Sequence, residues 1–373
     1  MKIMFTIMSL GYSGAPKMMA WVANQMAKKG HEVYLVTFFS DVQAHLLNEN
    51  VTTISLKVTK SRNRLVRNTT GMLKTISRLH STVKKIEPDV VVTFLDSVGY
   101  VYLPICHFFT KSKIIASERV DPYSYQGKTA RLRFALMRFA HGTVFQTPGA
   151  QRFFESRKSI YENSIVIPNP VVVSKKTLGM QKSIPAFSDR DKTIVTVGRL
   201  ALKQKRQDVL LDAFKIFHEK NPDYNLVIYG SGIDRQKIQM MIEERGIADC
   251  AFLPGAINRV EEMIFHAAAF VLTSDYEGIP NALIEAMSVG VPSVSTDCSP
   301  GGAALLISDG ENGFLVPRGD ANAIAEKLTI LVKDEETATR FSKNGPAITE
   351  KFAESFIADK WESFFKKYAN MKE

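Results

Sequence analysis

The stretch DYEGIPNALIEAMSVG, residues 275–290, decides the expected fold of this chain. The apolar and partly β-branched residues 269–273 come just before it and predict a buried strand. Gly278 and Pro280 then predict a tight turn, and Asn281 is a suitable N-cap for the helix-forming residues that follow. The order of strand, tight loop and helix is typical of a parallel, doubly wound α/β sheet.

Two glutamates frame this loop. Glu277 lies in the loop itself, and Glu285 lies about one turn into the expected helix, among apolar neighbours. The start of a helix has unpaired N–H groups and a partial positive charge, which favour an anionic ligand such as a diphosphate. A carboxylate among apolar side chains needs a polar partner, and a sugar or ribose hydroxyl would supply one. Two solvated surface charges are the alternative interpretation.

The motif EGIPNALIE, in which seven residues separate two glutamates, resembles the signature of the family 4 (group 1) retaining glycosyltransferases. The resemblance continues through NALIEAMSVGVPSVSTD and DGENGFLVPRGD. It implies the GT-B fold, an α/β architecture of two Rossmann-like doubly wound domains with an interdomain cleft. It also implies that Glu277 contacts the transferred sugar and that Glu285 holds the ribose of a nucleotide-sugar donor. The other residues expected at the donor site in this stretch are Gly278, Ile279, Pro280 and Asn281.

Strand-like and helix-like segments alternate in two series, which indicates two domains of similar fold. The expected strands of the first series are residues 2–8, 32–38, 51–56, 90–94, 114–117 and 143–146. Those of the second are residues 193–197, 225–229, 251–253, 269–273, 293–296 and 314–316. We therefore expect an acceptor-binding domain at 1–171, a linker at 172–191, a nucleotide-sugar-binding domain at 192–350 and a C-terminal helix at 351–373. The resemblance implies that this helix crosses back to the first domain.

The composition is that of a soluble globular protein, with 45% hydrophobic and 23% charged residues in a chain of 373. No apolar run approaches the ~20 residues that span a bilayer. The short apolar N-terminus is expected to be a strand rather than a signal peptide. Three cysteines and seven histidines lack metal-ligand or redox spacing, which favours reduced thiols and a cytoplasmic protein.

Two cations follow the first strand of the second series. Arg199 belongs to a Gly-Arg-Leu sequence, and Lys205 comes near the start of the next helix. Cations at such a junction suit a diphosphate leaving group, whose charge grows as the sugar bond breaks. The resemblance implies that both hold the donor phosphates, with Lys203 as an alternative to Lys205. We expect Glu277, Arg199 and Lys205 to carry the catalysis, without a cofactor or a bound metal ion.

Glycine turns after other strands extend the expected donor site. Gly14 lies in the loop that follows the first strand, where a glycine allows the backbone to approach a phosphate or sugar closely. Gly230 and Gly232 match the loop beside the nucleotide base in the family. The pattern around Gly14 is not a complete dinucleotide fingerprint, which disfavours a nicotinamide-dependent dehydrogenase.

Two polar residues that follow strands of the first series are candidates for binding the acceptor, Asp96 and Arg119. Many members of the family carry a histidine where Arg119 stands. A guanidinium stabilises phosphate charge but does not shuttle protons, so the general base is unassigned. In a retaining reaction with front-face attack, the leaving phosphate can accept the proton of the acceptor.

Residues 50–86 contain nine basic residues and no acidic one. At helical period Arg67, Lys74, Arg78 and Lys85 fall on one side, opposite an apolar side. Together with the net charge of +10, this stripe predicts an anionic partner: the phosphates of a lipid-linked acceptor or anionic headgroups. Residues 131–139, with arginines and aromatics, are typical of segments at membrane surfaces. Arg67, Lys74 and Arg78 are therefore further candidates for acceptor binding.

These observations predict a retaining glycosyltransferase on the inner face of the membrane. Its donor would be a nucleotide-diphosphate sugar, expected to be UDP-linked, that supplies a hexose or N-acetylhexosamine. Its acceptor would be a lipid-linked intermediate or glycan of surface polysaccharide synthesis. A GT-B sugar-nucleotide epimerase is one alternative. A nucleic-acid-binding protein also fits the charge, but no stacking platform or recognition motif accompanies it, and no nucleic acid is expected as a partner.

Overall fold

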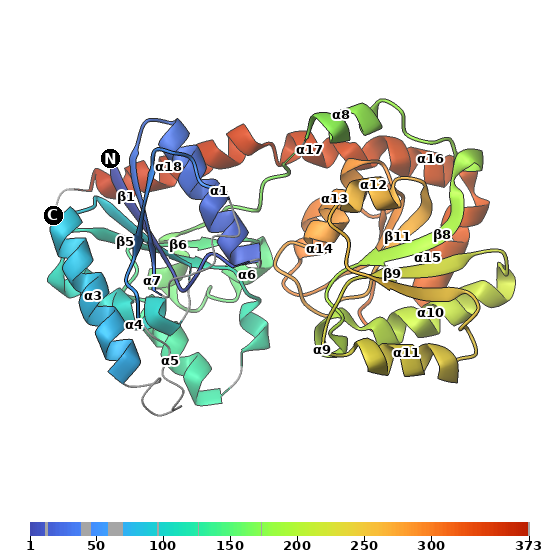
Figure 1. Cartoon of the computed structure of the whole chain (residues 1–373), viewed down its shortest axis with the longest axis horizontal. Helices are drawn as coiled ribbons and strands as arrows, with labels where there is room; N and C mark the ends of the chain where they lie inside the picture. The colour runs from blue at the N-terminus through green and yellow to red at the C-terminus, as the bar shows by residue number, and fades with distance from the viewer. Residues whose placement is uncertain are drawn as a thin grey trace. The chain divides into compact units, whose positions relative to one another are not determined.

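The computed structural model describes residues 1–11, 14–38, 46–58, 70–94, 97–125, 127–172 and 174–371. The chain divides into two compact units, and each is built around a parallel sheet with helices on both faces (Figure 1). The first unit comprises Met1–Asn169 and Ser355–Glu373, and the second comprises Pro170–Glu354. Residues 172–191, which we expected to be a linker, belong to the second unit. They include helix α8 (Lys175–Gln181), whose N-terminus is capped by the Ser174 hydroxyl, and the 3-10 helix η2 (Phe187–Asp189).

The sheet of the first unit has seven parallel strands in the order β3-β2-β1-β4-β5-β6-β7. The strands are β1 (Lys2–Ile7), β2 (Glu32–Thr37), β3 (Val51–Ser55), β4 (Val90–Phe94), β5 (Lys113–Glu118), β6 (Gly142–Phe145) and β7 (Ser164–Val166). Its helices are α1 (Gly14–Lys28), α3 (Thr70–Ile86), α4 (Ser97–Phe109), η1 (Pro122–Ser124), α5 (Gly127–Met137), α6 (Pro148–Arg152), α7 (Lys158–Tyr161) and α18 (Glu354–Ala369).

The burial of strand β4 shows that the sheet is covered on both faces. All five of its residues are buried, so the strand is an unbroken apolar run rather than an alternating one. Its side chains nevertheless alternate between two hydrophobic clusters, because successive residues of a strand point to opposite faces. Val90 and Val92 join one cluster, while Val91 joins the other.

The sheet of the second unit has six parallel strands in the order β10-β9-β8-β11-β12-β13. The strands are β8 (Asp191–Val197), β9 (Asn225–Tyr229), β10 (Ala251–Gly255), β11 (Ala267–Leu272), β12 (Ser293–Thr296) and β13 (Phe314–Val316). Its remaining helices are α9 (Leu202–Lys205), α10 (Gln207–Lys220), α11 (Arg235–Glu244), α12 (Val260–Ile264), α13 (Asn281–Ser288), α14 (Gly302–Leu306), α15 (Ala321–Lys333), α16 (Glu335–Asn344), η3 (Gly345–Ala347) and α17 (Ile348–Lys351).

Helix α18 packs on the sheet of the first unit. Trp361 on the buried face of the helix stacks on Phe94, with ring centroids 6.2 Å apart. Phe365 on the same face meets Phe5 edge-on. Two other aromatic residues of the C-terminal segment behave differently. Phe352 belongs to the core of the second unit, and Phe356 is 49% exposed. No helix in the described ranges is both long enough and apolar enough to cross a bilayer.

A partly buried carboxylate ties α18 to the α1–β2 connection. Glu362, whose side chain is 16% exposed, accepts hydrogen bonds from Lys366 at 2.6 Å, Lys29 at 3.1 Å and His31 at 3.0 Å. These bonds, with that from Lys366 the strongest, lower the pKa of Glu362 to about 2. The carboxylate therefore stabilises the fold fully above its ordinary pKa of 4.5, and this contribution is lost as the pH falls toward about 2.

Changing Glu362 to Gln is expected to lower the free energy of unfolding by about 1 kcal/mol at pH 7, because Lys29 and Lys366 are partly exposed and water screens their attraction to the carboxylate. The loss shrinks as the pH falls below about 4.5 toward about 2. Urea unfolding at several pH values measures this dependence. The same change at exposed Glu155, also in the first unit, is the control. A loss that stays constant with pH would show that packing, not charge, is responsible.

Candidate functional site

The strand order of the second unit brings together the two loops that the sequence singled out. Strand β8 lies between β9 and β11, so the direction of the strand order changes between β8 and β11. In open α/β sheets, ligands bind beyond the carboxyl ends of the strands at such a switch point. The loop with Arg199 and Lys205 follows β8, and the loop with Glu277 follows β11. These two loops form the candidate site.

Lys205 and Glu277 form an ion pair across the two loops. The Lys205 ammonium contacts Oε1 of Glu277, and the Ser274 hydroxyl donates to the same oxygen at 2.8 Å. The side chains of Lys205 and Glu277 are 17% and 12% exposed, so the pair is largely withdrawn from water. Lys203 is exposed, which makes Lys205 the lysine of this loop that meets the predicted glutamate.

Gln204 joins the same two loops, although we did not assign it from the sequence. Its side-chain oxygen accepts a hydrogen bond from Arg199 at 2.6 Å, and its amide nitrogen donates to the carbonyl of Tyr276 at 3.1 Å. Its backbone carbonyl accepts from the N–H of Asp275 at 2.9 Å. Gln204 therefore holds the Arg199 guanidinium next to the loop that carries Glu277. Its place directly before Lys205 was the only signal in the sequence.

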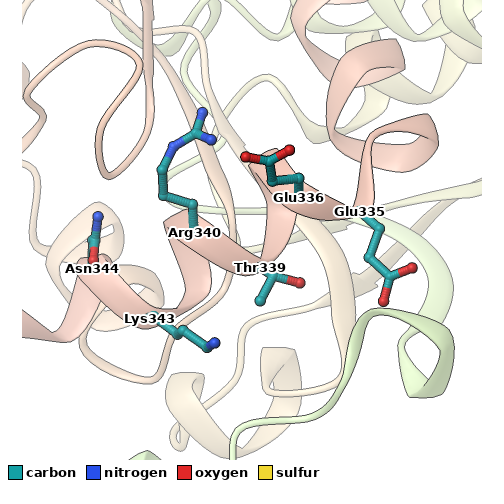
Figure 2. Close-up of a pocket in the computed structure, with 6 residues that line it drawn as sticks. All are labelled: Glu335, Glu336, Thr339, Arg340, Lys343 and Asn344. Carbon is teal, nitrogen blue, oxygen red and sulfur yellow. The ribbon is translucent and has the colours of Figure 1, made fainter.

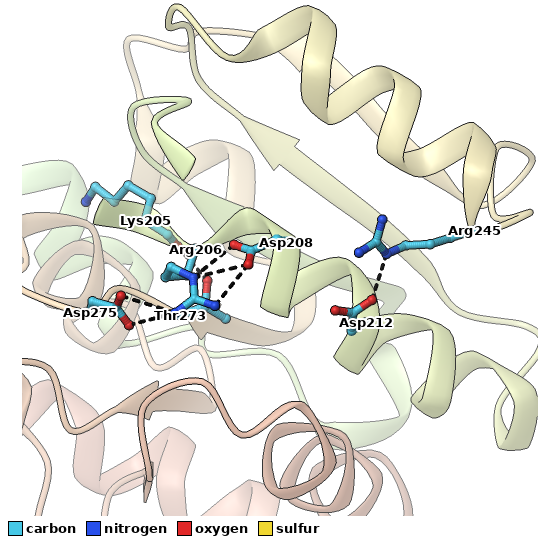
Figure 3. Close-up of polar contacts among 7 residues, drawn as sticks. All are labelled: Lys205, Arg206, Asp208, Asp212, Arg245, Thr273 and Asp275. Atoms are coloured by element: carbon cyan, nitrogen blue, oxygen red, sulfur yellow. Dashed lines mark hydrogen bonds and ion pairs between the residues drawn. The ribbon is translucent and has the colours of Figure 1, made fainter. Parts of the chain in front are cut away.

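Arg206 is a second residue that sequence reasoning missed. It has a left-handed backbone conformation, with φ of 48°, where α9 ends and α10 begins. Its guanidinium donates to the carboxylates of Asp208 and Asp275, and the bonds to Asp208 raise the pKa of Arg206 most. Figure 3 shows this cluster with the Lys205 side chain pointing away from it. Arg206 thus fixes the turn so that Lys205 faces Glu277, while the Arg245–Asp212 pair joins α10 to the end of α11.

Gly230 and Gly232 support the Arg199 loop through close backbone contact. A Cβ atom on Gly230 would lie 1.8 Å from the carbonyl oxygen of Gly198, and one on Gly232 would lie 2.1 Å from that of Leu200. Gly230 also has a φ of 148°. The structure thus gives both glycines a packing role, because no larger residue fits at either position without moving the loop.

The Glu277 loop is held from its other side by the segment after β12. The N–H of Glu277 donates to the carbonyl of Ser299 at 2.8 Å, and that of Ser299 donates to the carbonyl of Asp275 at 3.0 Å. A Cβ atom on Gly302 would lie 1.9 Å from the carbonyl oxygen of Gly278. The backbone of this loop is therefore fixed by hydrogen bonds and by close packing.

Helix α13 begins one residue earlier than we expected. Asn281 is its first residue rather than its N-cap, and the extended Pro280 takes the cap position without a side-chain hydrogen bond. The prediction was wrong because the carbonyl of Pro280 already accepts the N–H groups of Leu283 and Ile284. Ile279 and Pro280 are buried under the helix start, and Glu285 is half-buried one turn along α13.

The first unit gathers polar side chains after the carboxyl ends of β5, β6 and β7. The Arg119 guanidinium donates to Oδ1 of Asn169 at 2.5 Å and lies 5.1 Å from the ring centroid of Phe94. Gln146 donates to the same oxygen of Asn169 at 3.0 Å. Burial lowers the pKa of Arg119 to about 9. The Nη1 atom of Arg119 is buried without a hydrogen-bond partner among the described residues. We had not assigned Asn169 or Gln146.

Glu118 lies beneath Arg119 and orders its backbone. The buried carboxylate accepts the N–H groups of Arg119 and Val120 at 3.1 and 3.2 Å. It also accepts the Tyr100 hydroxyl at 2.8 Å and forms an ion pair with Arg133 at 3.1 Å. Burial raises the pKa of Glu118 to about 8, while the two N–H groups act in the opposite direction.

Several other predicted acceptor residues fall elsewhere. Asp96 and Arg67 lie outside the described residues. Gly14, which we expected at the donor site, is the first residue of α1, and the segment just before it also lies outside the described residues. Lys74 and Lys85 are exposed on α3 as expected. These residues remain candidates from the sequence alone.

Two arginines that we placed on basic surfaces make polar or ring contacts within the first unit. Arg78 is exposed, as the predicted stripe requires, and its guanidinium also donates to the carbonyls of Leu56 and Lys57 at 2.6 and 3.2 Å. Arg133 lies between the rings of Tyr100 and Tyr125, at 4.0 and 3.9 Å from their centroids. Phe134 of the same helix is buried as well. Residues 131–139 therefore have one buried side, with Phe134 and Met137, while Arg131, Leu132 and Arg138 are exposed, and the membrane role of the segment stays a prediction.

A separate hollow lies on α16 and is lined by that helix alone. Figure 2 shows its six side chains pointing in different directions, with acidic and basic groups interspersed. The Arg340 guanidinium donates hydrogen bonds to the carbonyl of Gly310 and to the hydroxyl of Thr337. Within the described ranges, no three His, Cys, Asp or Glu side chains gather in a way that suits a metal ion. The loops after β8 and β11 are thus the better candidate.

Comparison with known proteins agrees with this geometry. Residues 180–347 match the family described as glycosyl transferases group 1. The chain is 25% identical over 361 residues to an uncharacterized glycosyltransferase of Haemophilus influenzae, covering 96% of this chain and 98% of the relative. It is also 25% identical, over 97% of both chains, to a Campylobacter jejuni enzyme. That enzyme is named GalNAc-alpha-(1->4)-GalNAc-alpha-(1->3)-diNAcBac-PP-undecaprenol alpha-1,4-N-acetyl-D-galactosaminyltransferase.

Solved structures show the same architecture. The structure of HepE from Anabaena in complex with UDP has a TM-score of 0.78 and 19% sequence identity, and the match covers 98% of this chain and 100% of HepE. The two parallel-sheet units therefore define a protein of the GT-B class, which confirms the expected fold. The match to the group 1 glycosyltransferases lies within the second unit, and the two relatives that match nearly the whole chain are by name a glycosyltransferase and an N-acetylgalactosaminyltransferase.

Proposed function

We propose that this enzyme transfers a hexose or N-acetylhexosamine, with retention of configuration, from a UDP-linked sugar to a lipid-linked or glycan acceptor. The observation that carries the proposal is the pairing of Lys205 with Glu277 at the switch point of the second unit, next to Arg199. A largely buried lysine–carboxylate pair next to an exposed arginine suits a ligand with a diphosphate at one end and a sugar at the other.

In this proposal Arg199, Lys205 and the start of α13 bind the donor diphosphate. As the bond between the anomeric carbon and the phosphate oxygen breaks, negative charge grows on the diphosphate and the two cations stabilise it. Glu277 meets the sugar, and Glu285 meets the ribose. The acceptor hydroxyl forms the new bond to the anomeric carbon, and its proton passes to the leaving phosphate. No cofactor or metal ion takes part in these steps.

The first unit would bind the acceptor. The Nη1 atom of Arg119 is buried and has no hydrogen-bond partner within the described residues. A hydroxyl or phosphate oxygen of the acceptor substrate would accept a hydrogen bond from it. The name of the Campylobacter jejuni relative describes an undecaprenol-linked substrate, which supports a lipid-linked glycan as acceptor. We therefore place the enzyme in surface glycan or polysaccharide synthesis, at the cytoplasmic face of the membrane.

A panel of nucleotides and nucleotide sugars tests the donor, because a ligand that binds only the folded state raises the melting temperature. We expect UDP and at least one UDP-sugar to stabilise the protein more than GDP, ADP or free sugars do. The stabilisation should persist in EDTA, since the two cations replace a metal ion. Equal shifts for all nucleotides would contradict the assignment of the base. Loss of the UDP shift in EDTA, restored by manganese, would contradict binding without a metal.

A further inference from the structure

Helix α4 ends in two neighbouring phenylalanines that the core does not use. Phe108 and Phe109 are 63% and 66% exposed, whereas Tyr100 and Tyr102 of the same helix are buried. Single exposed apolar residues are common on soluble proteins. Here two adjacent rings project at a helix end, and Phe108 is supported edge-on by His107 and Phe139 at 4.9 and 5.4 Å between ring centroids.

Lysines surround these rings. Lys84 near the end of α3, Lys111 between α4 and β5, and Lys113 at the start of β5 line one hollow together with Phe108 and Phe109. Met371, which follows α18 and is 51% exposed, lines the same hollow. Exposed apolar groups ringed by flexible cations are typical of surfaces that enter the headgroup region of a bilayer.

The charges of this hollow favour an anionic partner. Its lining contains three lysines and two carboxylates, Glu87 and Asp89. The Asp89 carboxylate is already bonded to the backbone N–H of Lys2 at 2.7 Å. On α3 the basic surface continues through the exposed Lys74 and Lys85, and residues 70–86 contain no acidic side chain. The two carboxylates thus belong to the lining of the hollow, while exposed lysines continue along α3 outside it.

We infer that Phe108 and Phe109 insert into the interface of an anionic lipid bilayer, with Lys84, Lys111 and Lys113 at the headgroup phosphates. The inference rests on the proposed function only in one respect: membrane binding would bring the enzyme to the bilayer that holds a lipid-linked acceptor. It extends the basic stripe predicted from the sequence, through the exposed Lys85, to two phenylalanines and three lysines that the prediction did not include. The surface lies where β4 and β5 begin, and Arg119 lies where β5 ends. Lipid binding therefore leaves the Arg119 edge of the sheet uncovered.

Sedimentation of the full chain with lipid vesicles tests this surface. We expect binding to vesicles that contain phosphatidylglycerol and much weaker binding to pure phosphatidylcholine. Changing Phe108 and Phe109 together to Ser should weaken binding to the anionic vesicles at least about tenfold. Changing Lys111 to Glu should weaken it by fivefold or more at low salt, at roughly 1 kcal/mol for each lysine near such a surface.

Phe356→Ser is the matched control, because Phe356 is also an exposed phenylalanine beside a lysine, with Lys360 4.6 Å from its ring centroid. It should bind vesicles like the unchanged protein. All variants should keep the UDP-induced rise in melting temperature, which separates this test from failure of the proposed donor site. A Phe109→Trp variant should show a blue-shifted emission on anionic vesicles.

Two outcomes would overturn the inference. One is unchanged vesicle binding by the Phe108 and Phe109 double variant, with no blue shift from the tryptophan variant. The other is a double variant that changes from dimer to monomer in gel filtration but binds vesicles normally. That result would assign the surface to contact with a second copy of the chain.

Discussion

Changing Glu277 to Gln is expected to lower kcat for sugar transfer by about 10²–10³-fold. Glutamine keeps the size of the side chain and can still accept from the Ser274 hydroxyl, which lies 2.8 Å from Oε1. It removes the negative charge that pairs with Lys205, so the ammonium is no longer held in its place at the switch point. The rate of UDP release in the presence of acceptor measures the loss.

The control for this variant is Glu335→Gln on the exposed surface of α16, shown in Figure 2, which should transfer sugar at the normal rate. The pair is largely buried, so the Glu277 variant also needs a check of folding by circular dichroism. A folded Glu277→Gln protein with an unchanged kcat would remove Glu277 from the reaction. A higher KM with an unchanged kcat would assign it to donor binding alone.

Changing Gly230 to Ala is expected to abolish measurable UDP binding and to destabilise the second unit by about 3 kcal/mol. The new methyl group would lie 1.8 Å from the carbonyl oxygen of Gly198, and alanine rarely adopts a φ of 148°. The backbone of Gly198 cannot rotate away like a side chain. The loop that carries Arg199 must therefore move, and its guanidinium with it. Calorimetric titration with UDP and urea unfolding measure the two effects.

Gly179→Ala is the matched control for this prediction. Gly179 lies within helix α8 of the second unit, and a Cβ atom there has no neighbour within 4 Å. Alanine should therefore bind UDP normally and should stabilise the helix by up to about 1 kcal/mol. If Gly230→Ala behaves like this control, the close contact between the β8 and β9 loops is not what positions Arg199.

Much of the second unit could be predicted because its signals are local. Strand, turn and helix follow one another within residues 269–290, and parallel strands place all following loops at one edge of the sheet. Lys205 and Glu277 are 72 residues apart in the sequence, yet both follow strands that turned out to be neighbours. Their meeting therefore follows from strand order, while the roles we give them remain predictions.

The residues that were missed act through contacts that no local pattern shows. Gln204 bonds across to the Tyr276 carbonyl, and Arg206 bonds to Asp275, which is 69 residues away. The amphipathic patterns misled us for the same reason. A helical period shows which side of a helix is polar, but an arginine there can still reach inward, as Arg133 does.

The packing of α18 has a consequence for synthesis on the ribosome. The first unit needs Trp361, Phe364 and Phe365 to cover its sheet, but these residues are translated after all 185 residues of Pro170–Glu354. The second unit is therefore completed while the first still lacks part of its apolar surface. We therefore expect the first unit to finish folding only after α18 has emerged from the ribosome.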